Sequence, residues 1–176
     1  LPRPSASPHP GPYSINNDTR TLSETKYGWD VFHNMIFVDQ PIGTGFSYSK
    51  VLARERSGVL YGSGWLVGDW GSAVAATSQD PRDRVYDEKG VAVDMLDFMY
   101  EFYRAHPDML DNDFYVTGES YAGHYVPAVS SAIYRANELG QGPLTIPLVG
   151  LAIGNGMTVP AIQFPAYADF ALQNNL

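Results

Sequence analysis

The chain has 176 residues, of which 44% are apolar, so it is long and apolar enough to build the core of one domain. The formal net charge of −8, from 19 acidic and 11 basic residues, argues against the basic surfaces that bind nucleic acids or anionic membranes. The absence of cysteine excludes disulfides, thiolate zinc sites and a cysteine nucleophile. No phosphate-, zinc- or calcium-binding motif and no apolar run of roughly 18 residues is present, so we expect no cofactor, no metal and no membrane-spanning helix.

The first half of the chain predicts little regular structure. Five prolines fall within residues 1–12, and because proline lacks an amide hydrogen we expect a proline-rich arm there, ahead of a domain over residues 13–176. The short apolar block at residues 35–38, which a turn follows, predicts a buried strand. Residues 51–78 are rich in Gly, Ala and Ser and show no helical or strand period, so we interpret them as an insertion.

The second half has a clearer pattern. Apolar residues recur at helical spacing up to His106 and predict a helix with one buried face, at Val91, Met95, Phe98 and Phe102. A strand over 114–117, a helix over 121–137 and a strand over 148–153 are expected to follow. Because the strands are apolar runs that alternate with helices, we predict an α/β fold in which helices cover both faces of a mostly parallel sheet.

One motif lies at the carboxyl end of a predicted strand, where ligands bind in such sheets. Ser120 stands between strand and helix, and its neighbours Gly118, Ala122 and Gly123 are small enough for a strained turn that exposes the serine hydroxyl. Ser120 is therefore the candidate nucleophile, and the backbone N–H of Tyr121 is a candidate oxyanion donor at the start of a helix. A chance Gly-x-Ser-x-Ala stretch, or a serine that only caps the helix, remains the structural alternative.

The segment Gly-Glu-Ser-Tyr-Ala-Gly-His-Tyr-Val-Pro-Ala at residues 118–128 resembles the serine carboxypeptidase family, which has an α/β-hydrolase fold. Similar strings at residues 11–13, 36–49 and 153–156 come in family order, so the chain looks like the amino-terminal half of such a domain. The resemblance implies a partial α/β-hydrolase fold that is incomplete at its carboxyl end.

The resemblance also implies roles for three consecutive residues. Ser120 would attack the last peptide bond of a peptide or protein with a free C-terminus, and Tyr121 would supply a backbone oxyanion N–H. Glu119 would bind the substrate's terminal carboxylate, for which its own carboxyl has to be protonated. The family setting implies a secretory route, vacuolar or extracellular, and the Asn17-Asp18-Thr19 triplet is a candidate N-glycosylation site.

The chain departs from the family pattern in its catalytic partners. In α/β-hydrolases the acid and then the histidine follow the serine, yet the chain's histidines, His9, His33, His106 and His124, lie before or within the motif. His124 is better explained as a packed or capping residue of the following helix. The family's glycine-rich oxyanion stretch is absent, and His9 stands where the family has a carboxylate-binding glutamate.

We therefore expect the chain to be inactive by itself. A carboxyl-terminal partner segment, or a dimer, would complete the sheet that the chain begins. Two other readings remain open, a serine carboxypeptidase-like acyltransferase and a non-catalytic fragment.

Overall fold

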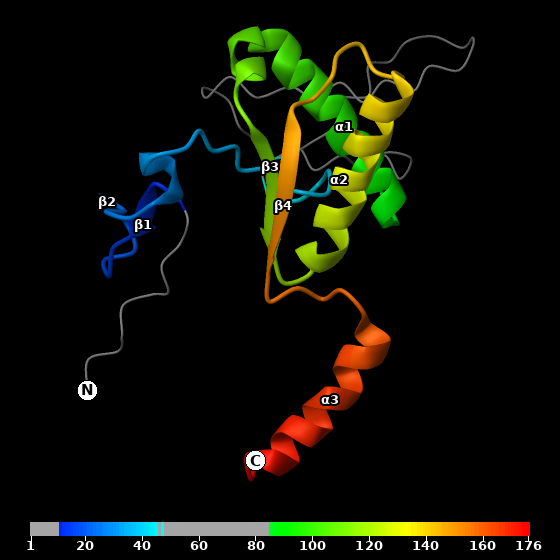
Figure 1. Ribbon diagram of the computed structural model, residues 1–176. Coiled ribbons are helices and arrows are strands. Elements are labelled where there is room, and N and C mark those ends of the chain that lie inside the picture. Colours follow the sequence, from blue (N-terminus) through cyan, green and yellow to red (C-terminus); the bar gives the residue numbers. More distant parts are fainter. Residues whose placement is uncertain (1–10, 46, 48–84) are drawn as a thin grey trace. The chain divides into compact units, whose positions relative to one another are not determined.

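The computed structural model describes residues 11–45, 47 and 85–176, so most of the expected arm and the whole expected insertion at 51–78 lie outside the described residues (Figure 1). Two compact units are distinguished, one up to Val38 and one from Asp39 onward, and each is described by itself. The helices and strands are β1 (Tyr13–Ile15), β2 (Leu22–Glu24), η1 (Trp29–Val31), α1 (Glu88–Ala105), η3 (Pro107–Asp111), β3 (Phe114–Glu119), α2 (Ala122–Leu139), β4 (Leu148–Gly154) and α3 (Pro160–Gln173).

The first unit contains a β-hairpin that the sequence pattern did not predict. β1 and β2 pair antiparallel, with Tyr13 opposite Glu24 and Ile15 opposite Leu22. The carboxylate of Asp18 organises the loop, because it accepts hydrogen bonds from the backbone N–H groups of Arg20 at 3.0 Å and Thr21 at 2.9 Å. Strands of three residues are too short to show an alternating pattern, which explains why the sequence did not indicate them.

The apolar block at residues 35–38 is not a strand, and this prediction was wrong. Ile36 is 38% exposed and Phe37 is 58% exposed, and neither has a ladder partner within the described ranges. A strand requires a neighbour that takes up its backbone N–H and C=O groups. The apolar pattern indicates only that a segment can be buried, and it does not specify such a neighbour.

The second unit has the helices and strands that the sequence predicted over residues 91–153. α1 begins after Asp87, whose side chain accepts a hydrogen bond from the backbone N–H of Gly90 at 2.8 Å, and it ends before Pro107. α2 ends at Gly140, which has a φ of 58° and so takes the left-handed conformation that terminates many helices. The prediction of strand, helix and strand after α1 is confirmed.

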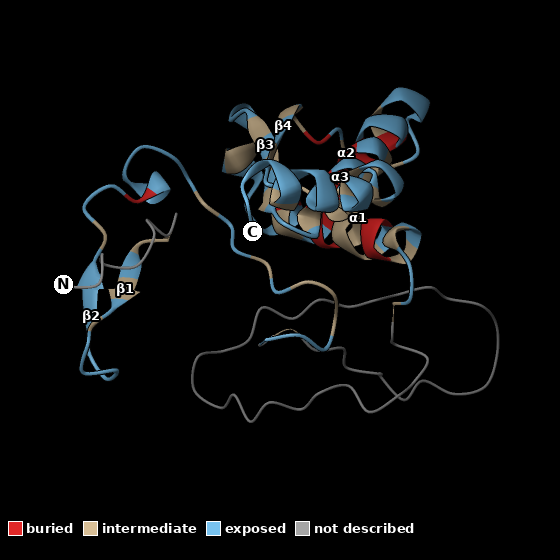
Figure 2. Ribbon diagram, turned by 90° about the horizontal axis from the view of Figure 1, so that it is seen from below, coloured by how far each residue is buried: buried red, intermediate tan, exposed pale blue. Residues whose placement is uncertain are grey.

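The two long strands form a parallel sheet that helices flank, as predicted. β3 and β4 pair parallel, with Thr117 beside Ala152 and Glu119 beside Gly154. α2 packs on both strands and α1 packs on α2, so the two helices lie on the same side of the sheet (Figures 1 and 2). The prediction that both faces are covered is not met within the described residues, since Tyr115 and Thr117 on the opposite face are exposed.

The core lies between α1, α2 and the sheet. Its most deeply buried side chains are Met99 of α1, Ile133 of α2 and Ile146, which precedes β4. The side-chain amide of Asn137 in α2 donates to the carbonyl of Ile146 at 2.8 Å and accepts from its N–H at 3.0 Å. Because an unpaired buried backbone group is costly, this double contact fixes the chain where it enters β4.

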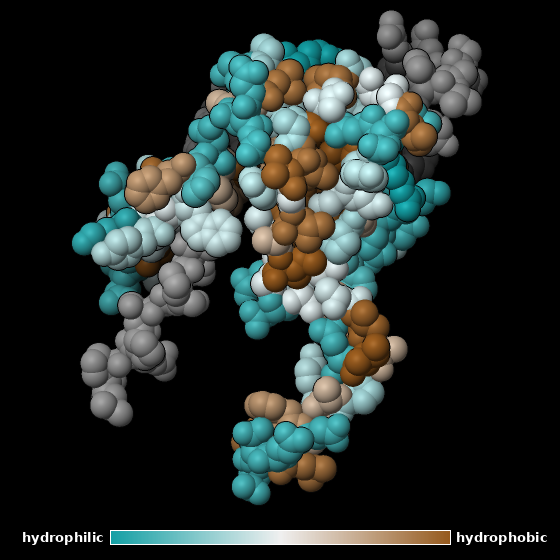
Figure 3. Space-filling view, viewed as in Figure 1, coloured by the Kyte–Doolittle hydropathy of each residue, from teal (hydrophilic) through white to brown (hydrophobic). Residues whose placement is uncertain are grey.

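α3 was not predicted and has no buried residue. Its apolar side chains, together with those of β4, form much of the hydrophobic surface in Figure 3. No helix among the described residues is long and apolar enough to cross a membrane.

Candidate active site

Ser120 occupies the turn between β3 and α2, which is the strand-turn-helix position that the sequence predicted. Its φ of 63° lies in the left-handed region, where a non-glycine residue is uncommon and strained. The residue is exposed. The backbone conformation and exposure of Ser120 therefore match those of a nucleophile elbow.

Small residues on either side allow this turn to pack closely. A Cβ added to Gly118 would overlap the Cβ of Ala122, and one added to Gly123 would lie 2.6 Å from the backbone nitrogen of Met157. Real Cβ atoms do not approach backbone atoms so closely. The steric reason given from the sequence is confirmed for Gly118 and Gly123.

The loop after β4 holds the backbone of the elbow. The N–H of Ser120 donates to the carbonyl of Gly154 at 3.0 Å, and the carbonyl of Ser120 accepts from the N–H of Met157 at 2.9 Å. Asn155 between these contacts also has a positive φ, of 45°. This support was not predicted from the sequence, although a Gly-Asn-Gly triplet directly after a predicted strand indicates a tight loop there.

Tyr121 follows Ser120 and occupies the N-cap position of α2, where its side chain makes no capping hydrogen bond. Within the described part of the chain its backbone N–H donates to no acceptor, so it remains available at the positive end of the helix dipole. The Tyr121 ring centroid lies 5.0 Å from that of His124 and 5.0 Å from that of Tyr125. These ring contacts orient the first turn of α2 beneath the elbow.

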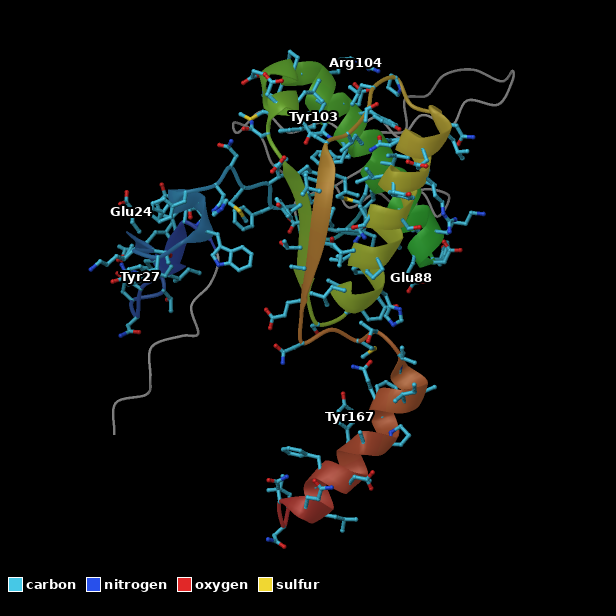
Figure 4. All side chains as sticks on the ribbon, in the orientation of Figure 1. Glu24, Tyr27, Glu88, Tyr103, Arg104 and Tyr167 are labelled. Atoms are coloured by element: carbon cyan, nitrogen blue, oxygen red, sulfur yellow. The ribbon has the colours of Figure 1, made fainter. Side chains whose placement is uncertain are left out.

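A hydrogen bond links the elbow to α1. The phenolic O–H of Tyr121 donates to Oε1 of Glu88 at 2.9 Å, and Figure 4 shows Glu88 at the start of α1. A hydrogen bond from its own backbone N–H and then the one from Tyr121 lower the pKa of Glu88. The same contact raises the pKa of Tyr121, because it is better made by the protonated phenol, and the negative charge of Glu88 adds to the rise.

Glu119 is the last residue of β3 and is exposed, next to Ser120 in the chain and beside Gly154 in the sheet. The structure thus brings the predicted residues Glu119, Ser120 and Tyr121 together at the carboxyl end of a parallel strand. Asn17, the predicted glycosylation residue, belongs to the other unit.

None of the described histidines is hydrogen-bonded to the Ser120 hydroxyl, which makes no hydrogen bond within the described residues. A ring nitrogen of His33 lies 3.2 Å from the carbonyl of Trp29, and the His106 ring centroid lies 4.9 Å from that of Phe102. His124 is half-buried against Tyr121. His9 lies outside the described residues, and no group of three or more His, Asp or Glu side chains in the described part could hold a metal ion.

A parallel pair of strands with a strained serine at the turn into the next helix defines the class, an α/β-hydrolase fold of which the chain covers part. The serine carboxypeptidase family model matches residues 6–176, and the chain belongs to the serine carboxypeptidase family. The resemblance stated from the motifs is confirmed.

Similar proteins are named as carboxypeptidases. The chain is 44% identical over 166 residues to Serine carboxypeptidase 3 of Hordeum vulgare, covering 94% of this chain. It is 35% identical over 166 residues to the Venom serine carboxypeptidase of Apis mellifera. Among solved structures it is similar to Kex1(delta)p, a prohormone-processing carboxypeptidase from Saccharomyces cerevisiae, with a TM-score of 0.74 and 27% identity, covering 96% of this chain.

The chain spans only part of these proteins. It corresponds to 27% of the length of the Hordeum vulgare protein, 28% of the Apis mellifera protein and 30% of the Saccharomyces cerevisiae chain.

Proposed function

We propose that this chain supplies the nucleophile of a serine-type carboxypeptidase, which hydrolyses the C-terminal peptide bond of peptides and proteins. The observation that carries the proposal is the φ of 63° at Ser120, directly after β3 and directly before α2. Strain of this kind persists only where surrounding contacts impose it, and here the backbone contacts to Gly154 and Met157 impose it.

In the proposed reaction Ser120 Oγ adds to the carbonyl carbon of the last peptide bond. The negative charge that develops on the carbonyl oxygen is stabilised by the free N–H of Tyr121 at the start of α2. The amine then leaves, and water releases the acyl group from Ser120. Removing one such oxyanion donor costs about 10²–10³-fold in rate in a well-studied hydrolase, which sets the scale for Tyr121.

Glu119 is proposed to bind the terminal carboxylate of the substrate. Its exposed side chain is adjacent to Ser120, at the same strand end. A protonated carboxyl donates a hydrogen bond to a carboxylate, whereas an ionised one repels it. Glu119 would therefore favour substrates with a free C-terminus under acidic conditions.

Ser120 also needs a general base, which we propose that the remaining part of the family domain supplies. A serine hydroxyl without a base is a weak nucleophile, and no described histidine is hydrogen-bonded to the Ser120 hydroxyl. The family's chain order places the acid and the histidine after the serine. The chain covers 27% of the length of the Hordeum vulgare protein. We expect the acid and the histidine in the rest of a protein of that length.

We also propose a secretory route for this chain. Two similar proteins support this proposal, a venom serine carboxypeptidase and a prohormone-processing carboxypeptidase, because venom proteins and prohormones are secreted.

A chimera tests the proposed reaction. The 176-residue chain is joined to the following sequence of the Hordeum vulgare protein, and release of the last amino acid from a blocked dipeptide is measured. We expect hydrolysis and a fluorophosphonate adduct on Ser120, and a loss of activity of about 10⁴–10⁶-fold in Ser120→Ala. Ser131→Ala, an exposed serine of α2, is the matched control and should keep activity.

Two results would overturn the proposal. One is a folded chimera that neither hydrolyses the substrate nor reacts with the fluorophosphonate. The other is activity that survives Ser120→Ala. Transfer of the acyl group to an added alcohol in preference to water would favour the acyltransferase reading instead. The unextended chain should form no adduct, because no described histidine is hydrogen-bonded to Ser120 and could act as its base.

A further inference from the structure

The loop of the β1–β2 hairpin contains Asn17-Asp18-Thr19, the one Asn-x-Ser/Thr triplet in the 176 residues. The backbone N–H of Thr19 donates to the carbonyl of Asn16 at 2.9 Å, which places Asn17 and Asp18 at the centre of a turn. All three residues of the triplet are exposed. The acceptor triplet for N-linked glycans is therefore presented at the tip of a hairpin.

Two neighbouring asparagines in this hairpin differ in their contacts. The amide of Asn16 donates to Oγ1 of Thr21 at 2.8 Å and accepts from Oγ of Ser23 at 2.7 Å, so it is part of the hairpin. The side-chain amide of Asn17 has no hydrogen-bond partner within the described residues. Substitution on the Asn17 nitrogen would break no hydrogen bond among the described residues.

Thr19 is held in an unfavourable backbone conformation. Its φ is 58°, in the left-handed region, where a β-branched residue is an outlier and Gly, Asn or Asp would be relaxed. The contacts of the Asp18 carboxylate to Arg20 and Thr21 keep the loop in this form. A folding requirement would not select threonine here, but an acceptor triplet must have Ser or Thr at this position.

We propose that Asn17 is an N-glycosylation site of this chain. In the transfer, Nδ2 of Asn17 forms a bond to C1 of the first sugar of a lipid-diphosphate-linked oligosaccharide. The bond between C1 and the diphosphate oxygen breaks, the lipid diphosphate leaves, and Nδ2 loses one proton to a base of the transferring enzyme. The glycan then projects from the loop tip into solvent, and the contacts of Asn16, Asp18 and Thr21 remain in place.

Translation in the presence of microsomes tests this site without reference to peptidase activity. The full 176-residue chain carries a cleavable secretory leader and a C-terminal tag with one known acceptor triplet, so every imported molecule gains one glycan from the tag. We expect two glycosidase-sensitive mass steps for the natural sequence and for Thr19→Ser. Asn17→Gln and Thr19→Val should show one step, because the first removes the nitrogen and the second removes only the hydroxyl.

Asn16→Gln is the matched control and should keep both steps, since it leaves the triplet intact. A single step for the natural sequence, with the tag modified, would overturn the proposal. Two steps in Asn17→Gln would overturn it as well, because the second glycan would then lie elsewhere. Failure of peptidase activity in the chimera would not affect either result.

Discussion

Ser120 and its neighbours show how a single residue can be held in a strained conformation. Such strain costs of the order of 1–3 kcal/mol and has to be offset by the contacts around it. Here the offset comes from backbone hydrogen bonds to Gly154 and Met157, and from the absence of side chains at Gly118 and Gly123. The turn therefore depends on residues that take no part in the proposed reaction.

The contact between Tyr121 and Glu88 should make stability depend on pH. The lowered pKa of Glu88 means that its contribution is present above its ordinary value of 4.5 and is lost as the pH falls through the folded-state value. The raised pKa of Tyr121 means that its contribution is present below its ordinary value of 10.0 and is lost as the pH rises through the folded-state value. The contact should thus stabilise the fold between these two limits.

We expect Tyr121→Phe to lower the melting temperature at neutral pH and to have little effect below the folded-state pKa of Glu88. Thermal unfolding across a pH series measures this difference. Tyr134→Phe is the matched control, because Tyr134 lies on the same helix, is exposed and has no hydrogen-bond partner in the described residues. Identical pH profiles for the two variants would contradict the prediction.

At the scale of elements, the elbow depends on a close approach between α2 and the connection from β4 to α3. An alanine Cβ at Gly123 would lie 2.6 Å from both the nitrogen and the oxygen of Met157. Since both are backbone atoms, the connection would have to move as a unit. This approach also sets the Ser120 contacts, so stability and site geometry are coupled here.

Gly123→Ala should therefore destabilise the chain by about 1–3 kcal/mol, the usual cost of overpacking a close contact. Urea unfolding measures the change. Gly154→Ala is the control, because its added Cβ would meet only the Glu119 side chain at 3.8 Å, an ordinary contact. An unchanged midpoint for Gly123→Ala would show that the connection moves easily and that the elbow is not tightly held.

The sequence predicted the elements whose pattern is long and regular. α1 has buried residues at helical spacing and clear signals at both ends, and the elbow motif lay where β3 and α2 were expected. The hairpin was too short to show a period. α3 has apolar residues around its circumference and an internal Pro165, so no single stripe indicated a helix. Contacts such as that of Glu88 with Tyr121 depend on folding and have no sequence signal.

At the scale of the whole molecule, the described part exposes more apolar surface than its own elements can cover. Leu151 pairs with Val116 and so lies on the α2 side of the sheet, yet it is 48% exposed, and Val149 is 56% exposed. α2 alone therefore does not cover β4. The chain matches only 27% of the length of the Hordeum vulgare protein. If the sheet is larger in the whole protein, this explains why β4 has exposed apolar residues here.

Among the described α-helices, α3 is the one that has no buried residue. It has 14 residues and none is buried, and an isolated helix of that length is marginal in water. Hydrogen exchange of the dilute chain should show residues 160–173 exchanging within about tenfold of an unstructured peptide, because little free energy opposes opening. α2, which buries Val129 and Ile133, should be strongly protected and serves as the internal reference.

Joining the chain to the remainder of a relative should raise protection over residues 160–173 and leave that of α2 nearly unchanged, since α2 is already packed on α1 and the sheet. Strong protection of α3 in the dilute chain would contradict this expectation. A rise in protection with chain concentration would identify self-association as the source, because burial between copies increases with concentration by mass action.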